Sequence, residues 1–192
     1  MEALFQKMIK DIFYEFYRPL GWRKQGQNFR YFQEDGLGRI INFQKSKWNT
    51  RDDLTFYINY GLYIEAGDTI ENKTFPEYIC QILNRTDGVK GEYRILSEKD
   101  IPYIKRKVVE DLREVTGFFN AIPTKKELVR VLLNGEIADF AKVKFLMSYP
   151  ICKLLSDMGY HKEIYDIIKD RDGRFFESLK EENRLWIEKN MQ

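Results

Sequence analysis

An alternation of apolar and polar residues in the first third of the chain restricts the possible folds more than any other feature. Successive side chains of a β-strand point to opposite faces of its sheet, so a period of two predicts a sheet with one buried face. We predict three antiparallel strands, two of which are joined by the turn-forming segment Glu34–Gly38. In the third strand, the residues predicted to pack on a helix are Phe56, Ile58, Tyr60, Leu62 and Ile64.

Helical spacing predicts helices on both sides of this segment in the sequence. Apolar residues recur at intervals of three and four over Leu4–Phe16, which predicts an opening amphipathic helix that Pro19 and Gly21 end. A second helix is predicted over Asp100–Gly117, with Asp100 as its N-cap. The remaining predicted elements are short strands at Tyr78–Leu83 and Glu92–Leu96, a helix begun by a capping box at Thr124–Glu127, and helices at Ile137–Ser148, Ile151–Met158, Lys162–Asp170 and Phe175–Lys189.

These elements predict an α+β fold in which the N-terminal helix packs on an antiparallel β-meander sheet, followed by a C-terminal all-helical subdomain. A chain of 192 residues is long enough for this arrangement. We place the boundary at Gly117, which gives an α+β sheet domain over residues 1–117 and a helical subdomain over residues 118–192.

The chain carries no sequence signature of catalysis, of a cofactor or of a metal site. His161 is the one histidine and is expected to be exposed, while Cys80 and Cys152 lie far apart and are expected to be buried free thiols. Phosphate-binding glycine motifs and a nucleophile elbow are absent from the sequence. Adjacent acids such as Asp52 and Asp53 are expected to be solvated surface charges. We therefore predict no catalytic, cofactor-binding or metal-binding residue.

Charge and hydropathy also bear on where the protein works. The net charge is only +2, but Arg18–Arg51 holds eight basic residues and two acids, a local +6. No apolar run approaches the roughly 20 residues that cross a bilayer. We expect a cytoplasmic protein without a membrane partner.

The polar face of the predicted sheet is the remaining candidate site. Amides and hydroxyls are poor strand formers, so their repetition within strands needs a cause. They either hydrogen-bond to one another as a structural network or form a surface that binds a ligand, and the two explanations are compatible. The candidate binding face consists of Arg30, Asn42, Gln44, Lys45, Ser46, Trp48, Tyr57 and Asn59.

Three segments of this region resemble a known family. Gly21–Lys24, Ile41–Asn49 and Phe56–Tyr63 are similar to the motifs of the bacterial domain-of-unknown-function family DUF4304, over roughly the first 115 residues. Trp22 stands where the family usually has phenylalanine, and Cys80–Asp87 departs further from its pattern. The resemblance implies an α+β fold in a bacterial cytoplasmic protein, and it brings no established activity, cofactor or catalytic residue.

We predict a non-enzymatic module that binds a protein partner through the polar face. By association with other small bacterial proteins, a toxin-neutralising immunity role fits this size and composition. The alternative is a nucleic-acid-binding module that uses the Arg18–Arg51 stretch, with Trp22, Tyr31 and Trp48 as stacking groups. A third hypothesis, an enzyme with an unrecognised carboxylate site, would need two acids meeting in a pocket.

Overall fold

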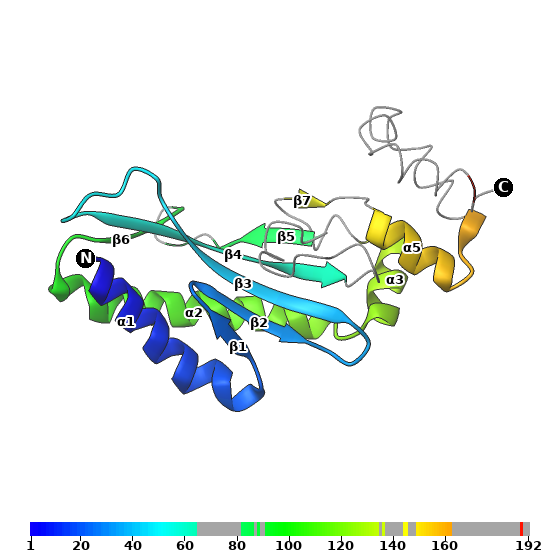
Figure 1. Ribbon diagram of the computed structural model, residues 1–192, viewed down its shortest axis with the longest axis horizontal. Coiled ribbons are helices and arrows are strands. Elements are labelled where there is room, and N and C mark those ends of the chain that lie inside the picture. The colour runs from blue at the N-terminus through cyan, green and yellow to red at the C-terminus, as the bar shows by residue number, and fades with distance from the viewer. Residues whose placement is uncertain are drawn as a thin grey trace.

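The alternating segments form the antiparallel sheet that the sequence predicts, with helices on one of its faces (Figure 1). The computed structural model describes residues 1–64, 82–86, 88, 91–134, 136, 144–145, 149–162 and 189. Its strands are β1 (Arg23–Gln25), β2 (Asn28–Phe32), β3 (Leu37–Lys45), β4 (Leu54–Ile64), β5 (Ile82–Arg85), β6 (Tyr93–Ile95) and β7 (Lys144–Phe145). They are ordered β1-β2-β3-β4-β5-β7. The strand β6 also pairs with the long strand β4, on the same edge as β5.

The sheet has an inner face that is covered by helices and an opposite face, which we call the outer face. Register pairs Phe43 with Ile58 and Ile41 with Tyr60, so the apolar residues of β3 and β4 share the inner face, as predicted. Phe56 lies there against Phe5 of the first helix, with ring centroids 4.9 Å apart. The inner face and the helices therefore enclose the main hydrophobic core.

The opening helix is confirmed, but its last part is irregular. α1 spans Glu2–Ile12 and continues into a π-helical turn, Phe13–Tyr17, and a 3-10 turn, Arg18–Leu20. Gly21 ends the segment with a positive φ of 81°, a conformation that residues with a side chain rarely adopt. The widened π turn changes which side chains face the neighbouring helix.

The second helix, α2, is longer than predicted. It spans Ile101–Ala121, so the prediction that Gly117 ends it was wrong. A glycine within a helix costs only about 1 kcal/mol, and the residues beyond it recover more than this by packing. Phe119 is buried, and its ring lies 5.8 Å from that of Trp22. α2 therefore carries the inner-face core past Gly117.

The later elements are partly as predicted. α3 (Lys125–Leu133) begins at Thr124, whose hydroxyl accepts a hydrogen bond from the Glu127 amide, and α5 spans Tyr149–Asp157. The prediction of a helix over Ile137–Ser148 was wrong for Lys144–Phe145, because these residues form strand β7, which pairs with β5 in the sheet. The helices predicted at Lys162–Asp170 and Phe175–Lys189 lie almost wholly outside the described residues. The division into two domains stays a prediction.

Two smaller expectations can be checked directly. Cys152 is a buried free thiol, as predicted, and burial raises its pKa to about 12. Cys80 lies outside the described residues, whereas His161 is exposed as expected. Within the described residues, no helix combines the length and apolar character that crossing a membrane requires.

Candidate functional site

The amide side chains on the outer face hydrogen-bond to one another in a ladder across the strands. Asn42 Nδ2 donates to Asn28 Oδ1 at 2.5 Å, which joins β3 to β2. Asn59 Nδ2 lies 3.2 Å from Asn42 Oδ1 and 2.8 Å from Gln44 Oε1, which joins β4 to β3. The structural explanation for these mid-strand amides therefore holds, because each supplies a partner for the next.

Arg85 of β5 extends this ladder to a fourth strand. Its Nε donates to Asn59 Oδ1 at 2.8 Å, and its Nη2 donates to Gln44 Oε1 at 3.2 Å. The guanidinium carbon lies 4.6 Å from the centroid of the Tyr57 ring, a cation–π distance. We call Arg85, Tyr57, Gln44 and Asn59 the Arg85 cluster. Three contacts fix the direction of one exposed cationic side chain.

Sequence reasoning did not include Arg85 in the candidate face. Its place depends on the register of β5, which pairs Arg85 with Asn59 although the two are 26 residues apart. No local pattern encodes such a register. Its sequence signals were the nearby predicted strand and a weak similarity of the segment from Tyr78 to Arg85 to the DUF4304 pattern.

The outer face is closed to solvent by buried side chains at one end and open to solvent at the other. At the closed end, Gly38 pairs with Phe32 and Tyr63, whose rings meet edge to face at 5.9 Å. A Cβ added at Gly38 would lie 2.9 Å from the Phe32 ring, so these rings take the space a side chain would need. Ile40 and Tyr63 are buried there, at 1% and 3% exposure.

At the open end, the accessible residues adjoin the β3–β4 connection. Gln44 and Arg85 are exposed and Tyr57 is half-buried, whereas Arg30 and Asn59 are only 8% and 9% exposed. Of the predicted face, Gln44 and Tyr57 are therefore accessible, while Arg30 and Asn59 are mostly structural. Arg30 also donates to Gln25 Oε1 on β1.

The connection between β3 and β4, Ser46–Asp53, holds an exposed tryptophan on an ordered backbone, and we call it the Trp48 loop. Asn49 closes it, because its side chain donates to the Thr55 carbonyl at 2.9 Å and accepts from the Thr55 amide at 2.8 Å. The Ser46 hydroxyl accepts from the Trp48 amide at 3.2 Å. Trp48 is nevertheless 80% exposed, with Lys47 Nζ 4.9 Å from its ring centroid.

Two sequence expectations about this surface were wrong. Lys45 does not lie on the outer face. It follows Phe43 by two residues in β3 and therefore points to the same, inner face, where it forms an ion pair with Glu2 of α1 at 2.9 Å. Trp22 is not available for stacking, because it is buried and packs edge to face on Tyr17 at 5.1 Å. Of the predicted stacking groups, Trp48 is therefore the one that is largely exposed, since Tyr31 is half-buried.

The two exposed arginines beside the long strand β4 differ in how their charge is balanced. Arg94 on β6 pairs with Asp53, with Nε 2.9 Å from Oδ1 and Nη2 2.5 Å from Oδ2. This contact lowers the pKa of the Asp53 carboxyl below its usual value. The guanidinium of Arg85 donates hydrogen bonds only to neutral oxygens and lies against the Tyr57 ring, and no carboxylate of the described chain pairs with it. Its charge remains open to an outside anion.

The buried polar groups elsewhere form a structural network. The Tyr93 hydroxyl donates to Asp111 in a short hydrogen bond and lies 2.8 Å from the Thr86 hydroxyl, while Lys107 donates to Asp111 at 2.6 Å. Burial, together with Asp111, raises the pKa of Tyr93 above its ordinary value. Among the residues that the structure describes, no cluster of histidine, cysteine and acidic side chains could hold a metal.

Fold and site together define a small α+β domain, in which a sheet backed by helices carries a pre-ordered polar surface beside an exposed tryptophan. A profile of the domain of unknown function DUF4304 matches residues 13–120, more than half of the chain. The chain therefore belongs to the DUF4304 family, and the matched residues include the Arg85 cluster and the Trp48 loop. No curated protein and no solved structure gives a significant match.

Proposed function

We propose that the chain is a non-enzymatic module that binds a protein partner through the Trp48 loop and the exposed part of the Arg85 cluster. The observation that carries the proposal is a tryptophan that is 80% exposed on a loop fixed by side-chain hydrogen bonds. An exposed indole on an ordered loop loses little conformational entropy on binding. A partner would therefore gain most of the hydrophobic free energy of burying it.

The composition of this surface also supports a protein partner. Tryptophan, tyrosine and arginine are the residue types that most often dominate the binding energy of protein interfaces. Trp48 would fill an apolar pocket of the partner, while Tyr57 and Arg85 supply a second, polar contact nearby. Since no carboxylate of the described residues pairs with Arg85, the partner is expected to be acidic at that point. A toxin with an acidic surface, neutralised by an immunity-like protein, would fit this chemistry.

A nucleic-acid partner has less support from the same residues. Single-stranded nucleic acids are held by several aromatic platforms in a basic groove. Trp22 lies in the core, and one face of the Tyr57 ring already holds Arg85. Phosphate contacts to exposed arginines would remain, so the experiment must separate the two classes of partner.

Site-specific photo-crosslinking tests the proposal. A benzophenone amino acid replaces Lys47, the exposed neighbour of Trp48, in one variant and Tyr103 in a control, since Tyr103 is a half-exposed aromatic residue of α2. After irradiation in cells of the source organism, we expect a protein adduct at position 47 and none at position 103. Arg85→Ala is expected to reduce the yield of this adduct, whereas Arg106→Ala, which removes an exposed arginine of α2 outside the proposed surface, leaves it unchanged.

Two results would contradict the proposal. One is the absence of any adduct specific to position 47 in cells where the protein is expressed and folded. The other is an adduct that nuclease removes, together with oligonucleotide binding that weakens steeply as salt rises. The second result would replace the protein partner with a nucleic acid.

A further inference from the structure

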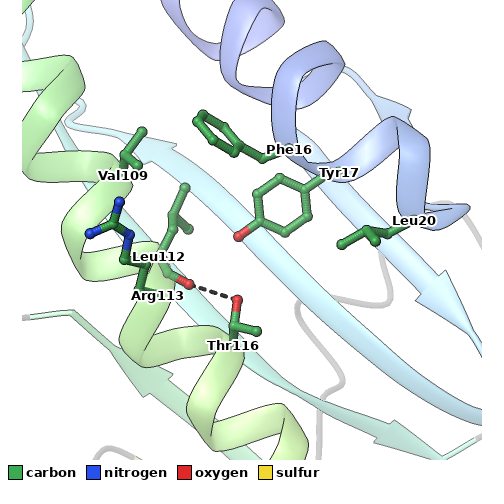
Figure 2. Close-up of a pocket in the computed structure, with 7 residues that line it drawn as sticks. All are labelled: Phe16, Tyr17, Leu20, Val109, Leu112, Arg113 and Thr116. Atoms are coloured by element: carbon green, nitrogen blue, oxygen red, sulfur yellow. Dashed lines mark hydrogen bonds between the residues drawn. The ribbon is translucent and has the colours of Figure 1, made fainter.

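A groove lies on the helical side of the molecule, away from the outer face of the sheet. It encloses about 200 Å³ between the end of the opening helix and α2 (Figure 2). Most of its lining is apolar, and two of the lining residues, Phe16 and Leu20, are large side chains that are 39% and 65% exposed. The residues that line it are Phe16, Tyr17, Leu20, Val109, Leu112, Arg113 and Thr116.

The π-helical turn accounts for this groove. A π turn adds a residue to the helix and widens it, so the side chains that follow are shifted around the axis. Tyr17 ends this turn and points inward, where its ring packs against Trp22 and Phe29 at about 5 Å. Phe16 and Leu20 then form one wall, opposite α2 (Figure 2). The aromatic contacts behind Tyr17 hold the floor of the groove in place.

The polar groups of the groove are mainly hydrogen-bond donors. Burial raises the pKa of Tyr17 to about 12, an effect that a hydrogen bond with Thr116 partly offsets, so its hydroxyl keeps its proton at every physiological pH. Arg113 forms no ion pair in the described chain, and its guanidinium lies along α2 at the rim, beside Val109 (Figure 2). The Thr116 hydroxyl donates to the Leu112 carbonyl at 2.9 Å and is thereby satisfied.

From this arrangement we propose that the groove binds a small amphipathic carboxylate, that is, one aromatic ring or short alkyl chain with an acid group. The volume is below the 300–1,000 Å³ that is typical of pockets for drug-sized ligands, so it admits about one ring. The walls of Phe16, Leu20 and Val109 cover the apolar body. A carboxylate accepts hydrogen bonds and cannot donate them, which matches the charged donors of the exposed Arg113 guanidinium at the rim.

The probe is phenylacetate, and its neutral isostere phenylacetamide is the matched ligand control. Each is titrated into the intact protein while the backbone amide shifts are followed by NMR. We expect saturable shifts at the groove with a dissociation constant of about 1 mM or below for phenylacetate. Binding of phenylacetamide is expected to be about tenfold weaker, because it lacks the charge that Arg113 attracts.

Variants of α2 localise the binding. Arg113→Met keeps the apolar stem of the side chain and removes its charge, so it should weaken phenylacetate binding about tenfold. Arg106→Met is the control, since Arg106 is an exposed arginine two turns earlier on α2 that does not line the groove. Thr116→Phe should fill the groove and abolish binding in a protein that stays folded, because Thr116 is exposed.

Three outcomes would overturn the proposal. Phenylacetate could give no saturable shifts at the groove up to about 10 mM, roughly ten times the expected dissociation constant. Phenylacetamide could bind as tightly as phenylacetate. Finally, Arg113→Met could bind no more weakly than Arg106→Met, which would remove the carboxylate contact.

Discussion

Replacing Asn59 by alanine tests whether the amide ladder holds the sheet together. Asn59 is 9% exposed and lies at the centre of the ladder. Its side chain donates towards Asn42 and Gln44 and accepts a hydrogen bond from Arg85. The variant removes all of these contacts at once, while the backbone pairing of β4 is kept.

The expected loss in the free energy of unfolding is about 2–3 kcal/mol. A hydrogen bond between neutral groups contributes about 1 kcal/mol net, and one to a charged donor about 1.5–3 kcal/mol. The full sum is not reached, because the exposed partners Gln44 and Arg85 can bond to water instead. The half-buried amide of Asn42 keeps its bond to Asn28.

Urea unfolding followed by circular dichroism measures this loss, with Gln44→Ala as the matched control. Gln44 belongs to the same ladder but is exposed, so its removal is expected to lower the free energy of unfolding by less than about 1 kcal/mol. If Asn59→Ala lowered it by less than about 1 kcal/mol with an unchanged slope, the ladder would contribute little to stability. Our account of the mid-strand amides would then be refuted.

Two further predictions concern the buried tyrosines. Tyr93→Phe leaves the buried Asp111 carboxylate without its hydroxyl donor, so we expect the free energy of unfolding in urea to fall by about 2 kcal/mol. In an Asp111→Asn background the same substitution should lower it much less. Stability should also fall as the pH rises above 10. Burial raises the pKa values of Tyr17 and Tyr93 above their ordinary value of 10.0, so the unfolded chain releases these protons first. Thermal unfolding between about pH 8 and pH 11 would show this decline in stability, and the decline should be smaller in Tyr93→Phe. An identical pH profile for both proteins would show that Tyr93 does not contribute to the decline.

The sequence predicted those parts of the fold that local patterns encode. Alternation placed Phe56 and Ile58 on the inner face and Asn42 and Asn59 on the outer one, because the period of two holds within each strand. The sequence did not show where the core ends. Lys45 points to the same face as the core residues of β3, but it lies at the end of the strand, where it forms an ion pair with Glu2.

The other errors arose from contacts between distant segments. Gly117 stays within α2 because tertiary packing of Phe119 outweighs a weak local preference. β7 pairs with β5 across about 60 residues, and Arg85 reaches the ladder through the register of β5. Strand pairing of this kind depends on the whole chain, so no pattern within one segment could have predicted it.

The ladder and the exposed residues beside it have separable roles. Because the amides satisfy one another, the outer face is stable without a partner, and Arg85 and Trp48 remain available to one. Substitutions at Trp48 should therefore reduce binding and leave the free energy of unfolding nearly unchanged, whereas Asn59→Ala should lower both. Asn59 orients the Arg85 guanidinium as well as joining two strands, so its loss removes order from the binding surface together with stability from the sheet.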